Sequence, residues 1–172
     1  MYDSYMYFPG FDEFKGETQD TEFKKKSAYE LMSFSIGAYN TVNIGSASGG
    51  GGAGKGEFQP LAVMKTTDSA SPVLFRMLMS GKHFDSAIIE MRRAGQTSTT
   101  SGGTFVKYEM KLVMVESLNW AGSQGSDVFM ESVSFRFGAI KMEYFAQAKD
   151  GKMTKVSDAM WSRVNNTASL EV

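Results

Sequence analysis

Residues 105–119 read FVKYEMKLVMVESLN and form the longest alternation of apolar and polar residues in the chain. A period of two is typical of a β-strand with one side in the core and the other side toward solvent. The apolar members share one side of the extended backbone: Val106, Tyr108, Met110, Leu112 and Met114. The charged members share the other side: Lys107, Glu109 and Lys111. The run therefore predicts an unusually long, half-buried strand.

The alternation continues downstream and changes parity once. Residues 133–137 and 140–144 both alternate, but the apolar side switches at Gly138-Ala139, which indicates a bulge or a sharp bend. The polar, glycine-containing residues 120–127 predict the turn of a long antiparallel hairpin. Further strand candidates are Tyr2–Phe8, Ala28–Ile36, Phe58–Lys65 and Asp85–Arg93. Many strands joined by short turns favour a mainly β fold, either a sandwich or a closed barrel, in a single domain over residues 1–172.

One short helix is indicated at about residues 71–80. Ser71 is a candidate N-cap, Pro72 suits the first helical turn, and Gly81 provides a left-handed stop. The segment is apolar nearly all round, so we expect it to be covered, most simply by plugging one end of a barrel.

Residues 40–56 contain seven glycines and predict an extended loop of the kind that carries function. Within it, Gly49–Lys55 has the glycine and lysine spacing of a phosphate-binding P-loop. The match fails afterwards, because Gly56 stands where magnesium binding needs Ser or Thr, and Pro60 excludes the helix that would hold the phosphate. We interpret the segment as a loop that becomes ordered against a partner, with a P-loop enzyme as the alternative.

Composition argues against catalysis. The 172 residues include no Cys and a single His, His83, which removes thiolate chemistry and most metal sites. Ser123 has no base nearby in sequence, and the acidic residues Glu17, Asp20 and Glu22 lack the spacing of a calcium loop. We therefore expect no enzyme, no cofactor and no bound metal.

The charge balance and the first residues of the sequence bear on the binding partners of the protein and on its location. A net charge of -1 leaves no basic field for nucleic acid. No apolar run approaches the length of a membrane span, and the first residues do not resemble a signal peptide. We expect a protein made in the cytoplasm, with no membrane insertion, and exported by a route that reads no cleaved signal.

Seven blocks in order and in register resemble one family over roughly residues 1–150. They are Gly16–Asp20, Met32–Gly37, Gly49–Lys55, Asp68–Leu74, Ser80–Phe84, Arg93–Gly95 and Glu131–Phe135. Together they resemble the haemolysin-coregulated protein (Hcp) family, the tube protein of the bacterial type VI secretion system.

The resemblance implies a small antiparallel β-barrel of two packed sheets with one short helix, assembling into hexameric rings that stack into the injected tube. It implies as partners the chain itself, a spike protein, a contractile sheath and small effectors carried in the ring lumen, with release outside the cell or into target cells. By the family's pattern, the loop that contacts a neighbouring ring or subunit would be Gly49, Gly50, Gly51, Gly52, Ala53, Gly54 and Lys55. The turn near the channel that contacts effectors would be Gly122, Ser123 and Gln124. The alternative is a tail-tube protein of another contractile system.

Overall fold

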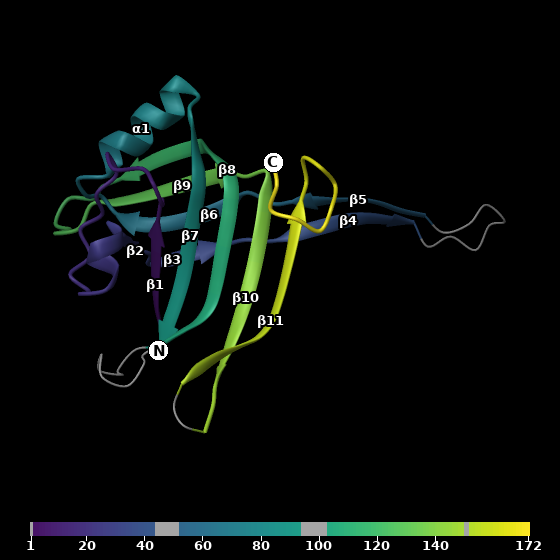
Figure 1. The fold of residues 1–172 in the computed structure, drawn as a ribbon. Coiled ribbons are helices and arrows are strands. Elements are labelled where there is room, and N and C mark those ends of the chain that lie inside the picture. The colour runs from purple at the N-terminus through teal and green to yellow at the C-terminus, as the bar shows by residue number, and fades with distance from the viewer. Residues whose placement is uncertain (1, 44–51, 94–102, 150–151) are drawn as a thin grey trace.

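Antiparallel strands make up most of this protein, whose computed structural model describes residues 2–43, 52–93, 103–149 and 152–172. Nine strands of the described residues form one sheet (Figure 1). They are β1 (Tyr2–Tyr7), β2 (Tyr29–Glu30), β3 (Ser33–Ser35), β6 (Leu61–Thr66), β7 (His83–Arg93), β8 (Thr104–Ala121), β9 (Met130–Arg136), β10 (Ala139–Gln147) and β11 (Met153–Ser162). The other two, β4 (Ala38–Asn43) and β5 (Gly52–Phe58), pair with each other. The helices are α1 (Ser71–Ser80) and a 3-10 turn at Phe23–Lys26. The prediction of mainly β structure with one short α-helix is confirmed.

Strand β8 is the central strand of the sheet. One edge pairs with β7, and the other pairs first with β10 and then with β9. Between those two partners, Leu112 has a positive φ of 53°. This residue turns the strand, so that Val113 is buried and Met114 is exposed. The predicted placement of Met114 on the buried side with Met110 is therefore wrong. The alternation of apolar and polar residues gives no sign of a residue with left-handed backbone in the middle of a strand.

The predicted bend at Gly138 is confirmed and is sharper than a bulge. The chain leaves β9 at Arg136 and starts β10 at Ala139, and the Gly138 amide donates to the Lys111 carbonyl across the corner. A Cβ at Gly138 would lie 3.1 Å from Val164 Cγ2 and 3.3 Å from Leu112 Cδ2. The corner favours glycine here, because a larger residue would require neighbouring side chains to shift.

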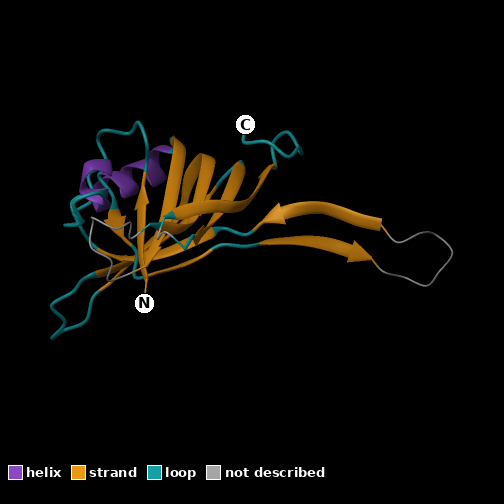
Figure 2. Cartoon of the chain, turned by 60° about the horizontal axis from the view of Figure 1, so that its bottom comes forward, coloured by secondary structure: helices purple, strands orange, loops and turns teal. Residues whose placement is uncertain are grey.

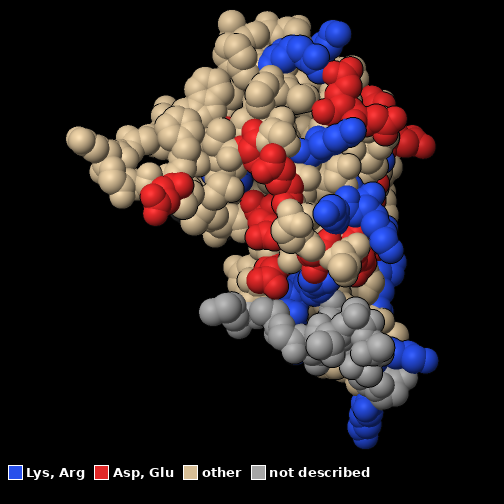
Figure 3. Space-filling view, turned by 90° about the vertical axis from the view of Figure 1, so that its left-hand side faces the viewer, with Lys and Arg blue, Asp and Glu red and all other residues tan. Residues whose placement is uncertain are grey.

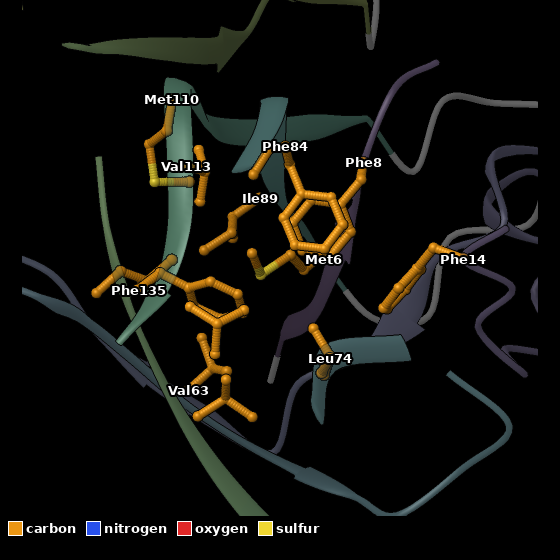
Figure 4. Close-up of a cluster of buried hydrophobic side chains, with 14 of the residues drawn as sticks. Met6, Phe8, Phe14, Val63, Leu74, Phe84, Ile89, Met110, Val113 and Phe135 are labelled. Atoms are coloured by element: carbon orange, nitrogen blue, oxygen red, sulfur yellow. The ribbon is translucent and has the colours of Figure 1, made fainter. Parts of the chain in front are cut away.

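The hydrophobic core lies between the sheet and the elements folded over it. Figure 4 shows side chains of β1, β6, β7, β8, β9 and α1 pointing toward one another. Helix α1 has the predicted bounds and ends at Gly81 with φ 65°. Its N-cap is Ala70, because the Ser71 hydroxyl is engaged elsewhere. Only one side is covered: Leu74 and Met77 are buried, whereas Phe75 and Met79 are exposed, which corrects the expectation of an all-round covered helix.

The two ends of the strand order meet in one short segment. Strand β2 pairs with β1, and β3 pairs with β6 at the far end of the order. Only Leu31 and Met32 separate β2 from β3 in the chain. The Leu31 amide donates to the Ser4 carbonyl and the Met32 amide donates to the Met64 carbonyl, both at 2.8 Å. The segment therefore bridges the sheet's opposite ends.

Strands β4 and β5 form a hairpin that stands away from the rest of the molecule (Figure 2). The predicted loop at residues 40–56 is thus strand at both ends, since residues 40–43 and 52–56 are paired. Glycine keeps its backbone donor and acceptor, so a glycine-rich segment still forms a ladder when its partner strand is adjacent. Gly49, Gly50 and Gly51 lie outside the described residues.

Candidate assembly surfaces

The β4–β5 hairpin is anchored at its root by the C-terminal segment. Arg163 Nη2 lies 2.6 Å from Glu57 Oε2, and Lys55 Nζ donates to the Arg163 carbonyl at 3.1 Å. These groups are partly exposed, so the anchor is a surface one. Tyr39, opposite Glu57 at the root, and Val42, farther out, are both more than half exposed. The hairpin therefore presents apolar side chains to solvent.

The predicted hairpin site residues Gly52, Ala53, Gly54 and Lys55 all lie in β5. Lys55 lies within a strand, and its ammonium donates to the Arg163 carbonyl at the hairpin root. A P-loop lysine instead lies at the N-terminus of a helix. The geometry fits a projecting arm and offers no phosphate cradle in the described part of this segment.

An apolar groove of about 340 Å³ lies between the hairpin root and the β10–β11 pair. Its lining comes from both sides and from the sheet between them: Ile36, Gly37, Ala38, Phe58, Tyr108, Phe137, Ile140, Met142, Ala159, Met160 and Trp161. The floor is rigid, because the Phe58 and Phe137 rings stack with centroids 5.0 Å apart. The sequence did not reveal this groove, since its residues come from five separate segments.

Strands β10 and β11 extend the apolar surface outward from the groove. Cross-strand pairing puts Ile140 beside Trp161 and Met142 beside Ala159, so these four side chains share one side of the ladder. Met142 and Trp161 remain exposed. Within the described residues β11 has a strand ladder only with β10, so its outer edge is available for another partner.

The β8–β9 turn carries the predicted cargo-contact residues Gly122, Ser123 and Gln124, all of them exposed. Phe129 lies over Gly122, where a Cβ would stand 2.6 Å from Phe129 Cε2. The absence of a side chain at Gly122 makes room for the phenyl ring. The turn thus combines a polar tip with an exposed aromatic side chain.

A buried ionic cluster fixes the turn end of the β8–β9 ladder, where Glu131 pairs with Trp120. Lys65 Nζ lies 2.7 Å from Glu131 Oε1 and 2.8 Å from Asp68 Oδ1, and both Lys65 and Glu131 are almost fully buried. Ser71 Oγ on α1 donates to Glu131 Oε1 at 2.8 Å, and Trp120 Nε1 donates to Glu131 Oε2 at 2.9 Å. The cluster therefore ties β6, β8, β9 and α1 together.

Sequence reasoning missed this cluster, although a signal was present. Lys65 falls on the same side of its strand as the buried Leu61 and Val63, and Glu131 falls on the same side as the buried Val133 and Phe135. Opposite charges at apolar positions of two strands indicate a buried pair once the strands are in register, and Lys65 and Glu131 are directly opposite.

A second buried carboxylate, Glu90, lies in the centre of β7. Burial acts to raise its pKa, but hydrogen bonds from Lys26, Thr104 and Tyr7 outweigh it and hold the pKa of Glu90 below its ordinary value. Burial and the hydrogen bond to Glu90 raise the pKa of Tyr7 far above its usual range. Glu90 is therefore ionised and fully occupied as an acceptor, which is a structural role.

The residues considered for metal binding are dispersed. Asp20 is paired with Arg92, and His83 is exposed with Nε2 3.5 Å from Asp85 Oδ1. In the described ranges, no group of three or more His, Cys, Asp or Glu residues could hold a metal ion.

Charges of both signs alternate over the face shown in Figure 3, with no extended basic field on it. No helix among the described residues is long and apolar enough to cross a membrane. The exposed features with the most apolar character are the hairpin, the groove beside it and the β8–β9 turn.

Comparison with known proteins decides the family. A sequence model described as "Type VI secretion system effector, Hcp" matches residues 5–144. This chain belongs to the Hcp family. Hcp proteins are secreted by type VI systems, and the family is structural and non-enzymatic, which confirms the resemblance read from the sequence and the prediction that the chain is no enzyme.

Individual Hcp relatives agree in sequence and in fold. Protein hcp1 of Pseudomonas aeruginosa is 31% identical over 93 residues, which are 54% of this chain and 56% of that protein, so the match spans about half of each. A structure described as a type six secretion system protein superposes with a TM-score of 0.84 at 27% identity, covering 97% of this chain and 99% of that one. Hcp1 from Salmonella typhimurium gives a TM-score of 0.71 at 26% identity, covering 96% of this chain and 97% of that one.

Proposed function

We propose that this chain is the tube subunit of a type VI secretion system, in which six copies close into a ring around a channel and rings stack into the injected inner tube. The observation that carries the proposal is the Hcp family match over residues 5–144. The same ring would also serve a tail tube of another contractile system, but the family match favours type VI.

The subunit of the proposed ring is a closed β-barrel. Support comes from Leu31 and Met32, whose amides bond to the two opposite ends of the strand order. Closure removes the sheet edges that otherwise invite uncontrolled pairing, and it leaves β11 as the edge directed to a neighbour.

The ring interface lies on the β10–β11 pair and the adjoining apolar groove. A ring needs two different complementary surfaces on each subunit, because each copy contacts its neighbours head to tail. Met142, Trp161 and the groove lining form an apolar surface continuous with the core, and exposed apolar area of this kind marks an interaction site. Packing against the next copy would remove this apolar surface from water.

The remaining roles follow the family. The arm Gly49–Lys55 contacts the neighbouring ring, and the polar tip Gly122–Gln124 contacts small effectors in the lumen. A spike protein and a contractile sheath are the other partners, and neither nucleic acid nor membrane is one. The protein is made in the bacterial cytoplasm and leaves through the type VI machinery without a cleaved signal, toward the medium or a target cell.

The oligomeric mass tests the proposal. Six copies of the 18.9 kDa chain weigh about 113 kDa, and light scattering of the purified protein should give that mass, with six-fold rings in negative-stain images. Met142→Lys places an ammonium in the groove and should shift the mass to that of the monomer.

Met64→Lys is the matched control. Met64 is 44% exposed on β6, against 42% for Met142, so the substitution is the same in type and exposure on a different surface. It should leave the ring intact. A wild-type protein of monomer mass would contradict the ring, and equal effects of both variants would remove the interface from β10–β11.

A further inference from the structure

We propose that the exposed aromatic patch formed by α1 and the β8–β9 hairpin is the docking surface for the β4–β5 hairpin of a second copy of this chain. The aromatic patch is defined as Phe75, Met79, Trp120 and Phe129. The inference rests on the proposed tube and adds to it the surface that receives the projecting arm.

The aromatic patch is a continuous row across two elements. Trp120 pairs with Glu131 across the β8–β9 ladder, and Phe129, two residues before Glu131, lies over Gly122 just after β8 ends. The Phe75 ring of α1 packs on Trp120 with centroids 5.6 Å apart. Met79 lies one helical turn after Phe75 and shares its side of α1.

The patch is large and held in place, yet uncovered. Its four side chains are between 43% and 70% exposed. Trp120 is fixed by its hydrogen bond to the buried Glu131, so the patch does not collapse onto the core. Rigid, exposed aromatic side chains dominate the binding energy of protein interfaces. The patch therefore has the properties of a receptor surface.

The hairpin and the aromatic patch lie at opposite ends of the molecule (Figures 1 and 2). Strand β6 begins three residues after β5 and runs away from the hairpin, and its last residue, Thr66, pairs with Met130 beside Phe129. Phe58 to Thr66 spans roughly 26 Å at about 3.3 Å per residue. The β4–β5 hairpin and the aromatic patch therefore lie at the two ends of the axis along which β6 runs.

The hairpin and the patch are different surfaces at opposite ends of one axis. Binding of the hairpin of one copy to the patch of the next therefore joins the copies head to tail. Such a heterologous contact does not close on a pair of molecules, because each new copy presents a fresh hairpin and a fresh patch. It repeats along the axis, as a stack of rings requires. The ring contact on β10–β11 uses another surface, so the two contacts do not compete.

The chemistry of the hairpin complements that of the patch. Tyr39 and Val42 supply exposed apolar surface for the aromatic side chains. Lys55 and Glu57 are the charged residues in positions 38–58, and Glu57 is already paired with Arg163. Lys55 has no carboxylate partner among the described residues, and Asp127 in the β8–β9 turn has no ion pair there either. The hairpin therefore carries a cation, and the turn an anion, that has no opposite charge as a partner among the described residues.

The absence of native cysteine gives a direct test, because every thiol is an introduced one. Val42→Cys combined with Met79→Cys places one thiol on the hairpin and one on the patch. A short bifunctional maleimide, applied to concentrated protein, should then give a ladder on denaturing gels that extends beyond six chains. Each single variant can give at most two linked chains.

The control is Val42→Cys combined with Met32→Cys. Met32 is 63% exposed and Met79 is 70% exposed, so thiol accessibility is matched while the surface differs. A ladder beyond six chains only with Met79→Cys supports the docking. No ladder, or equal ladders from both pairs, overturns it.

Light scattering before cross-linking separates this inference from the proposed function. A six-chain mass without the ladder overturns the docking surface and leaves the ring intact. A monomer mass with a ladder specific to Met79→Cys supports the docking and overturns the ring. A monomer mass without a ladder overturns both.

Discussion

The two long hairpins of this Hcp protein have the same backbone pattern and different side-chain anchors. The β4–β5 hairpin is held by partly exposed groups, Glu57 and Arg163, and stands away from the core. The β8–β9 hairpin grows out of the core and is held by the buried Glu131. Because the backbone ladders are alike in both, the side chains that anchor each hairpin decide whether it projects as an arm or stays fixed on the core.

Removing Glu131 should have the largest effect on this comparison. Glu131→Ala leaves the Lys65 ammonium buried with only Asp68 as a charged partner, and breaking a buried pair in this way costs roughly 3–5 kcal/mol of the free energy of unfolding. The Trp120 indole loses its acceptor as well. Urea unfolding followed by tryptophan fluorescence measures both effects.

The double variant Lys65→Met with Glu131→Leu is the control. Replacing both charges by apolar groups of similar size removes the buried Lys65–Glu131 pair, and Asp68 keeps its hydrogen bonds from the Ala70 amide and the Ser71 hydroxyl, so part of the lost stability should return. If Glu131→Ala were as mild as a surface substitution, the buried cluster would not be what fixes the β8–β9 hairpin.

Glu90 tests whether burial of charge, rather than the hairpin itself, explains that sensitivity. It is buried in β7, outside both of these anchors, and hydrogen bonds from Lys26, Thr104 and Tyr7 outweigh burial and hold its pKa below the ordinary value. The unfolded chain then binds more protons near its ordinary pKa of 4.5, so stability should fall as pH drops from about 5 through the lowered pKa of the folded state. Chemical denaturation at successive pH values measures the slope.

Glu90→Gln should flatten part of that slope. It removes a charge-assisted acceptor, so we expect a loss of about 1.5–3 kcal/mol at neutral pH and a smaller difference from the wild type in acid. A variant with the same loss at every pH would show that Glu90 does not titrate with folding.

The sequence could predict those features of the fold that leave a local pattern of residues. Strand periodicity found β8 and the corner at Gly138, because half-buried strands and close glycine corners leave local patterns. It misplaced Met114, since the left-handed Leu112 changes the buried side without changing residue type. The pairing inside residues 40–56 was missed because a glycine-rich segment shows no periodicity of its own.

Candidate surfaces were predicted only where one segment carries them. The turn at residues 120–127 was predicted from its composition, and Gly122–Gln124 were named as a cargo contact only from the family resemblance, whereas the aromatic patch beside them was not predicted. Phe75 and Trp120 lie 45 positions apart in the chain and meet only after α1 packs on β8. Likewise, the opposed charges of Lys65 and Glu131 gain meaning only when β6 and β9 are in register.

At the root of the β4–β5 hairpin, Arg163→Ala should have a small effect. The pair with Glu57 is partly exposed, and surface ion pairs contribute roughly 0–1 kcal/mol. Urea unfolding should therefore resemble that of the wild type. A loss comparable to that of Glu131→Ala would show that this hairpin is fixed by its side-chain anchor as firmly as β8–β9 is.

The smallest effect on stability is expected at the polar tip of the β8–β9 turn. Ser123→Ala with Gln124→Ala removes exposed side chains that are outside the core, so the free energy of unfolding should change by no more than about 0.5 kcal/mol. If the tip contacts cargo, the amount of effector recovered with purified rings should nevertheless fall. Thr41→Ala, an exposed polar residue of the β4–β5 hairpin, should leave effector recovery unchanged. Equal recovery with both variants would remove the cargo role from the turn, whereas a loss confined to the tip variant would assign carriage to the fixed hairpin and leave the reaching arm for contacts between copies.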